Sequence, residues 1–466
     1  MVLTYDSHQK SSYMVISMIN QECTPSAESA PLSTLILCDF DGTVSTKDTV
    51  NRLVREHLTS PEWRFHVKRY MRGEIGSRAV YESVGPLMTM TREQLEQFVL
   101  EHAELDPGFP DFLRWANDRG VAVKIVSDGF DATIKTLFRN HGISDVEIFA
   151  NTLNFGNAGT IGIHSPFSNP DCGVCGTCKL QVIRTFRPHY DRIILIGDGE
   201  SDRHAASEAD AVIALKELFL YCARQGIPAI RGDGFHEIPA LLSKRIRAVT
   251  FDMDGTLVDS LGSIGDAFNH MFAELGYPSM TLEEVVRNTS ISLLDFVRTF
   301  LRPEEVEEGV RIFRDYYDTI FLERTTVMPG VPETLAALNG TIQGIVTNKR
   351  GKYARLLAEH LGLAGSMTRI IGAEDGFKAK PSGDMFEEFM RSVGTDREHT
   401  IYVGDAPIDC EAAHNAGIDA FVIPGPIFSA QELALYGPRR VLQRITDLPA
   451  ALEPLVPCSF ASKEVK

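Results

Sequence analysis

A short motif built around two aspartates occurs twice in this chain. The first copy reads Asp-Phe-Asp-Gly-Thr at residues 39–43, and the second reads Asp-Met-Asp-Gly-Thr at residues 252–256. A short apolar run precedes each copy, so each pair of aspartates is expected at the end of a buried strand. There the first carboxylate can attack an electrophile and the second can transfer a proton. The repeat therefore predicts two related catalytic domains in tandem.

Apolar runs of strand length alternate with helical stretches in both halves. This pattern predicts an α/β fold with two doubly wound, Rossmann-like parallel sheets. Open sheets of this kind bind ligands beyond the carboxyl ends of their strands, where the aspartates lie. The strands are predicted at residues 35–39, 121–127, 146–150, 192–197 and 211–215, and at residues 247–252, 343–347, 369–372, 400–404 and 420–423.

The domain organisation follows from the same pattern. Residues 1–32, rich in Ser, Thr and Gln, indicate a poorly ordered lead-in. A helix predicted to close the first domain (33–244) leads directly into the first strand of the second (245–466), so the two halves are expected to touch. A long insert of helical pattern separates the first two strands of each half, at about 45–120 and about 260–328. These inserts predict a helical cap over each site.

Composition excludes several classes of function. The net charge of -17 argues against a nucleic-acid surface. No apolar stretch approaches the roughly 18 residues of a membrane span. Eight cysteines in 466 residues do not form a disulfide framework, so a reducing cytoplasm is the expected compartment. Net charge does not argue against a small phosphorylated substrate, because a local metal ion and lysine dominate the field inside a cleft.

Four elements recur in the same order in both halves. The aspartate pair is followed by a Ser or Thr after an apolar run, then by a lysine, and then by a Gly-Asp segment with a further Asp. Each residue type alone is more often a cap, a turn or a surface residue. Their ordered repetition favours active sites, made of Asp39, Asp41, Ser127, Lys179, Asp198 and Asp202, and of Asp252, Asp254, Thr347, Lys380, Asp405 and Asp409.

These residue types suit the hydrolysis of a phosphate monoester. Attack by a carboxylate on a dianion requires charge neutralisation, which Mg²⁺ held by oxygen ligands supplies. Asp39 and Asp252 suit the nucleophile that forms an aspartyl-phosphate, and Asp41 and Asp254 suit the general acid and base. Lys179 and Lys380 would balance the negative charges. The residues predicted to bind the phosphate are Ser127, Asp128, Gly129, Lys179, Thr347, Asn348 and Lys380. Those predicted to bind the metal ion are Asp39, Asp41, Asp198, Asp202, Asp252, Asp254, Asp405 and Asp409.

The ordered set resembles the haloacid dehalogenase superfamily, whose largest branch contains magnesium-dependent phosphatases. The resemblance covers residues 34 to about 450. It implies one Mg²⁺ per domain, with the backbone carbonyls of Asp41 and Asp254 as additional ligands, and small phosphorylated metabolites as substrates. Dehalogenases lack the second Asp, so dehalogenation is disfavoured, whereas phosphomutases keep it and stay an alternative.

The two halves resemble different branches of that superfamily. The first half is similar to phosphoserine phosphatases and, in the Cys-Gly-rich approach to Lys179, to the 2-hydroxy-3-keto-5-methylthiopentenyl-1-phosphate phosphatases. The second half, with its Asp-Met-Asp-Gly-Thr-Leu-Val-Asp-Ser segment and Lys380-Pro381, resembles phosphoglycolate phosphatases. Two branches in one chain favour two substrates over a recent duplication of one enzyme.

A cluster of cysteines precedes Lys179. Cys172, Cys175 and Cys178 have the spacing of Zn²⁺ or iron–sulfur ligands, but a structural zinc needs four ligands. His164 and His189 are the nearest candidates for the fourth. The favoured interpretation is a tight turn that presents Lys179, with Zn²⁺ as the alternative.

The sequence thus predicts a cytoplasmic enzyme with two active phosphatase sites. The alternatives are one phosphatase domain fused to a phosphomutase or phosphotransferase, or to a silent copy used for dimerisation or ligand sensing. A monomer and a homodimer both stay open, because relatives often dimerise and a tandem can satisfy that contact internally.

Overall fold

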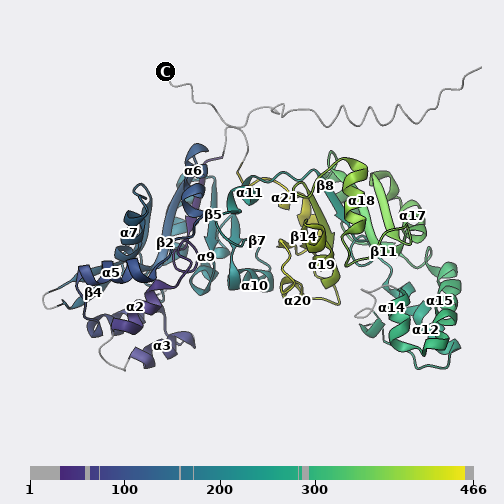
Figure 1. The fold of residues 1–466 in the computed structure, drawn as a ribbon, viewed down its shortest axis with the longest axis horizontal. Helices are drawn as coiled ribbons and strands as arrows, with labels where there is room; N and C mark the ends of the chain where they lie inside the picture. The colour runs from purple at the N-terminus through teal and green to yellow at the C-terminus, as the bar shows by residue number, and fades with distance from the viewer. Residues whose placement is uncertain are drawn as a thin grey trace, which may run out of the picture.

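The computed structural model describes residues 32–57, 63–72, 74–156, 159–171, 173–281, 283–285 and 293–456. Within these residues the chain forms two α/β domains that lie side by side (Figure 1). Except for Leu32, the predicted lead-in at 1–32 lies outside the described residues. None of the helices in the described part of the chain combines the length and apolarity needed to cross a bilayer.

The first sheet has the strand order β4-β3-β2-β1-β5-β6-β7. All neighbouring strands pair in parallel except β3 and β4, which are antiparallel. Each strand predicted in this half overlaps an observed one, whereas β4 and the edge strand β7 were not predicted. The bounds are β1 (Thr34–Cys38), β2 (Ala122–Phe130), β3 (Glu147–Phe155), β4 (Ile161–His164), β5 (Arg192–Gly197), β6 (Ala211–Ala214) and β7 (Ala229–Arg231).

The second sheet has the order β12-β11-β8-β13-β14-β15, which repeats the order of the first sheet without β4. Its neighbouring strands all pair in parallel. The predicted fold class, two doubly wound parallel sheets in tandem, is confirmed. The strands are β8 (Ala248–Phe251), β11 (Ile342–Arg350), β12 (Arg369–Ala373), β13 (Thr400–Gly404), β14 (Asp419–Val422) and β15 (Arg440–Val441), and a separate small ribbon pairs β9 (Val258–Asp259) with β10 (Thr326–Val327).

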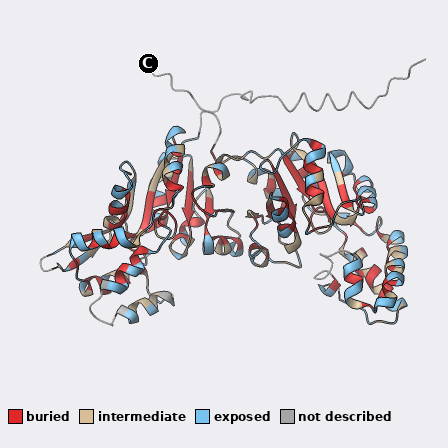
Figure 2. Cartoon of the chain, in the orientation of Figure 1, coloured by how far each residue is buried: buried red, intermediate tan, exposed pale blue. Residues whose placement is uncertain are grey.

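Helices cover both faces of each sheet, and the central strands β1, β5, β8 and β13 are almost wholly buried (Figure 2). This burial explains why the central strands are largely apolar. The helices of the first half are α2 (Thr49–His57), α3 (Trp63–Met71), α4 (Ser77–Val84), α5 (Arg92–His102), α6 (Phe109–Asp118), α7 (Asp131–Asn140), α8 (Lys179–Phe186), α9 (Arg203–Ala206), α10 (Lys216–Gln225) and α11 (Ile238–Ser243). Those of the second half are α12 (Leu261–Glu274), α14 (Leu293–Phe300), α15 (Val306–Ile320), α16 (Val331–Ala337), α17 (Gly351–His360), α18 (Asp384–Val393), α19 (Pro407–Ala416), α20 (Ala430–Ala434) and α21 (Leu448–Ala451).

A group of helices from each insert lies beyond one end of its sheet (Figure 1). In the first half these are α2 to α5, while α6, which the predicted cap range also includes, contacts β2 and α11 instead. In the second half they are α12, α14 and α15, which pack against one another through Phe268, Phe296 and Phe313. We propose these helices as the caps, and we propose the domain boundary in the segment between α11 and β8.

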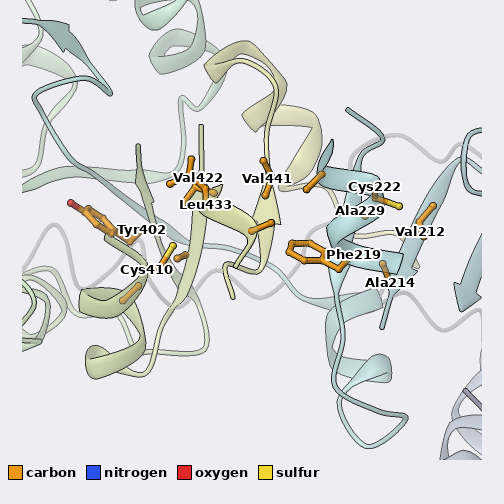
Figure 3. Packing of buried hydrophobic residues seen from close by; sticks show 14 of the residues in the cluster. Val212, Ala214, Phe219, Cys222, Ala229, Tyr402, Cys410, Val422, Leu433 and Val441 are labelled. Atoms are coloured by element: carbon orange, nitrogen blue, oxygen red, sulfur yellow. The ribbon is translucent and has the colours of Figure 1, made fainter. Parts of the chain in front are cut away.

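The two domains touch through equivalent elements. Helix α10 follows β6 in the first domain, α20 follows β14 in the second, and these two helices pack together (Figure 3). Beside them, the edge strands β7 and β15 lie next to each other. The backbone N–H of Arg231 donates a hydrogen bond to the carbonyl of Arg439 at 2.9 Å. One apolar cluster, which includes Phe219 and Leu433, runs through both domains. The predicted contact between the halves is therefore present.

The Arg439 side chain carries the polar part of this interface. Its Nε lies 2.9 Å from Asp419 Oδ1, and its two Nη atoms each lie 3.2 Å from an oxygen of Glu237 in the other domain. Lys244 contacts the second oxygen of Asp419 at 2.6 Å. Burial raises the pKa of Asp419, but the charges of Lys244 and Arg439 outweigh it and hold the pKa below its ordinary value. The ion pairs thus link the domains beside the apolar contact.

Candidate active sites

Both sites lie at the carboxyl ends of the central strands. Asp39 follows β1 and Asp198 follows β5, which are neighbours in the first sheet, and Asp252 and Asp405 follow β8 and β13 in the second. Parallel strands end at the same edge of a sheet, so the sequence order brings these carboxylates together. Two carboxylate triads result, each with oxygens within 4.8 Å of one another: Asp39, Asp198 and Asp202, and Asp252, Asp405 and Asp409.

A buried lysine joins two members of each triad. Lys179 is only 2 % exposed, and its Nζ lies 2.7 Å from a carboxylate oxygen of Asp39 and 2.6 Å from one of Asp202. Lys380 repeats the arrangement at 3.0 Å from Asp252 and 2.7 Å from Asp409. Burial alone would lower the pKa of each lysine, but the paired carboxylates outweigh it and raise the pKa. Both lysines therefore stay charged.

The second aspartates, Asp41 and Asp254, lie in different surroundings. Asp41 Oδ1 accepts a hydrogen bond from the backbone N–H of Thr49 at 3.0 Å. Burial, and then the charge of Asp48, raise the pKa of Asp41 to about 7. Asp254 instead forms an ion pair with Lys349, whose Nζ lies 2.8 Å from Oδ1 and 3.1 Å from Oδ2. The two domains thus support their second aspartates with different partners.

The predicted phosphate-binding residues Ser127 to Gly129 and Thr347 to Asn348 lie near the carboxyl ends of β2 and β11. Ser127 and Thr347 are both 1 % exposed, and their hydroxyls accept hydrogen bonds from the backbone N–H groups of Gly129 and Lys349. The next side chains along each strand, Asp128 and Asn348, bind the loops that contain or lead to Lys179 and Lys380. Asp128 accepts from Thr177 N–H at 2.9 Å, and Asn348 exchanges hydrogen bonds with the backbone of Lys380. These two side chains therefore fix the loops that present the lysines.

Comparison with known proteins agrees with this geometry. Residues 34–229 match the family model described as "Putative Phosphatase", and residues 249–423 match that of the haloacid dehalogenase-like hydrolases. A 2-hydroxy-3-keto-5-methylthiopentenyl-1-phosphate phosphatase of Bacillus velezensis is 33 % identical over 208 residues, which are 44 % of this chain and 87 % of that protein. The chain belongs to the haloacid dehalogenase-like hydrolases. Since its relatives are phosphatases, it is a phosphatase.

Other known proteins are similar to one half of the chain. A protein of Brevibacillus brevis with the same phosphatase name is 29 % identical over 215 residues, 45 % of this chain and 95 % of that protein. The solved structure of a haloacid dehalogenase-like hydrolase from Streptococcus pneumoniae is 27 % identical, with a TM-score of 0.42, and the match covers 45 % of this chain and 99 % of that one. The two family models match separate halves of the chain, which agrees with two domains in tandem.

The donor set of each haloacid dehalogenase-like site fits Mg²⁺. Each triad offers only carboxylate oxygens, the hard ligands that this ion prefers. In the second site Asp252 Oδ1 is buried and makes no hydrogen bond, although it lies 3.0 Å from the Lys380 ammonium. Burial raises the pKa of Asp252 to about 6, against the charge of Lys380. A cation in the triad would favour the ionised form of these crowded acids.

The cysteine cluster is incomplete in the described residues, because Cys172 lies outside them. The groups of metal-binding type found in the described part of the chain are the two carboxylate triads, and neither includes Cys175 or Cys178. Cys178 is buried directly before α8, whose first residue is Lys179. The described geometry therefore gives no support to Zn²⁺ at this loop.

Two lysines near the sites were not predicted to act there. Lys349 follows Thr347-Asn348, where the first half has Gly129, and this difference between the aligned motifs was the available signal. Lys216 begins α10, and its Nζ lies 2.5 Å from the Gly42 carbonyl and 3.0 Å from Asp198 Oδ2. Its φ of 44° is in the left-handed region. No sequence pattern indicated this contact, because it depends on how α10 packs.

Proposed function

We propose that this chain hydrolyses phosphate monoesters of small metabolites at two Mg²⁺-dependent active sites. The observation that carries the proposal is the repeated arrangement of a largely buried carboxylate triad, two members of which contact a buried lysine. Asp39, Asp198 and Asp202 would hold the ion in the first domain, and Asp252, Asp405 and Asp409 in the second, with the Asp41 and Asp254 carbonyls. When bound, Mg²⁺ would neutralise charge on the phosphoryl group.

In the first step, a carboxylate oxygen of Asp39 or Asp252 forms a bond to phosphorus. The bond from phosphorus to the ester oxygen breaks, and Asp41 or Asp254 gives its proton to the departing alcohol. The neighbouring lysine, Lys179 or Lys380, offsets the charge of the carboxylates during the transfer. The pKa of Asp41 near 7 supports its role as a proton donor at neutral pH.

In the second step, water attacks the phosphorus of the aspartyl-phosphate. Asp41 or Asp254, now ionised, takes a proton from this water, and the bond from phosphorus to the nucleophilic aspartate breaks. Phosphate leaves and both aspartates return to their starting states. Ser127 and Thr347, with the backbone N–H groups that follow them, would hold the phosphoryl oxygens throughout.

For the first domain we propose a substrate of the class named in its relatives, 2-hydroxy-3-keto-5-methylthiopentenyl-1-phosphate. The support is the match of residues 34–229 to a phosphatase family and the 29–33 % identity to proteins of that name. The cavity beside Asp39 has a volume of about 480 Å³. Its lining includes polar cap residues able to bind a hydroxylated chain, namely Asp48, Asn51, Arg55, Tyr70 and Ser77.

The test is phosphate release by Asp39→Asn, Asp252→Asn and the double variant over a panel of phosphate esters. Each single variant should lose the substrates of one site, and the double variant and EDTA-treated enzyme should lose all release. The exposed acid Asp315 supplies a matched control, since Asp315→Asn should behave as the unmodified enzyme. Full activity of one single variant on every ester would indicate a silent copy. Activity of the double variant would refute the mechanism.

A further inference from the structure

The cavity over the second site is lined mainly by apolar side chains. It has a volume of about 160 Å³ and extends from Asp252 to the helices α12, α14 and α15. On the cap side the described lining includes Leu261, Ile264, Phe268, Leu293, Phe296 and Phe313. On the sheet side it includes Tyr353, Ile408, Ile427 and Phe428. Beyond the phosphate-binding end, a substrate would therefore contact hydrocarbon and aromatic surface.

The cations that line this cavity already have acidic partners. Lys349 is paired with Asp254, and its side chain is only 5 % exposed. Arg314 and Arg350 share one carboxylate, that of Glu374, at 2.7 and 2.6 Å, and the buried Nε of Arg314 makes no hydrogen bond with the described residues. A second anionic group on the substrate would either share these arginines with Glu374, whose like charge repels it, or enter the apolar region without a partner. Both arrangements are unfavourable, because like charges repel each other and an unpaired charge loses its hydration on burial.

The first site differs in this respect. Its cavity is larger and carries the polar side chains of the first cap, including Asp48, Asn51 and Arg55. The second cap offers the aromatic cluster of Phe268, Phe296 and Phe313 at the equivalent place, with ring centroids 3.9 and 4.5 Å from Phe268. The first cap thus brings polar side chains beside the valines of its cavity, whereas the second cap brings mainly aromatic and aliphatic ones.

We propose that the second site hydrolyses phosphate monoesters of uncharged, apolar alcohols, aromatic ones included. The proposal rests on the proposed function of that site and names its substrate class. Esters of hydroxy acids, such as 2-phosphoglycolate, are disfavoured there, because each cation among the described lining residues already has an acidic partner, which repels their carboxylate.

The first experiment uses the full chain with Asp39→Asn, which confines turnover to the second site. Benzyl phosphate and 4-carboxybenzyl phosphate share a ring and a leaving oxygen and differ by one charge. Because the carboxylate would be desolvated against the apolar wall or repelled by Glu374, kcat/KM should be at least about tenfold higher for benzyl phosphate. Equal values, or a preference for the carboxylated ester or for 2-phosphoglycolate, would overturn the proposal. Release from none of the esters would instead refute the proposed activity of the site, and this proposal with it.

The second experiment changes the cavity wall. Ile264 is a partly exposed lining residue of α12, so Ile264→Lys places a cation in the wall, and Ile264→Met is the control of similar volume. In the Asp39→Asn chain, the Lys variant should reduce or reverse the preference for benzyl phosphate, and the Met variant should keep it. Competitive inhibition of the same turnover by benzylphosphonate gives a second readout at this site alone, and it should be stronger than inhibition by the 4-carboxy analogue. The reverse order of inhibition would contradict the proposal.

Discussion

Replacement of Gly42 by alanine tests how closely the first site is packed. Gly42 has φ +78°, and a Cβ there would lie 2.2 Å from Asp198 Oδ2 and 2.9 Å from Asp198 Cγ. Ordinary contacts between such atoms are near 3.5 Å, so the carboxylate would have to move by about 1 Å. A displacement of that size in a catalytic group can cost about a hundredfold in rate. Gly42→Ala should therefore lower kcat/KM at the first site about a hundredfold.

Gly142 is a matched control for the backbone effect. Its φ is +69°, but an added Cβ would meet nothing within 4 Å. Both alanine variants should lose about 1–2 kcal/mol of unfolding free energy, the cost of the left-handed conformation, as measured by urea denaturation. Only Gly42→Ala should lose activity and require more Mg²⁺ for half-maximal phosphate release, assayed in the Asp252→Asn chain. Activity of Gly42→Ala within threefold of Gly142→Ala would refute this account of the site.

Two further predictions concern the interface and the pH profile. Arg439→Met should cost about 2–4 kcal/mol of unfolding free energy, because it leaves Glu237 and Asp419 largely buried without this partner. The exposed control Arg311→Met should leave the unfolding free energy nearly unchanged. A loss from Arg439→Met no larger than that of the control would contradict the interface role. In the Asp252→Asn chain, kcat should fall as pH rises through about 7, because Asp41 must be protonated to donate, and Asp48→Asn should move this fall to lower pH by removing a like charge. A flat profile between pH 6 and 9 would count against Asp41 as the acid.

The sequence indicated those candidate site residues that directly follow a buried apolar strand. Asp39 and Asp252 could be placed because each follows a buried strand, and Asp198 and Asp405 because they follow its neighbour. The edge strands β7 and β15 escaped prediction because they are short, at three and two residues. Lys216 escaped because its contact with Asp198 depends on how α10 packs. The composition of the cap cavities could not be predicted, because helical periodicity does not show which side chains face the site.

The central claim is that each domain uses its own aspartate as a nucleophile. Enzyme quenched during turnover with a mixture of esters for both sites can be treated with borohydride, which reduces an aspartyl-phosphate to homoserine. Peptide mass spectrometry should then find homoserine at positions 39 and 252, and at neither position in the Asp39→Asn, Asp252→Asn double variant. Homoserine at one position alone would restrict catalysis to that domain. Its absence from both positions during active turnover would contradict the account.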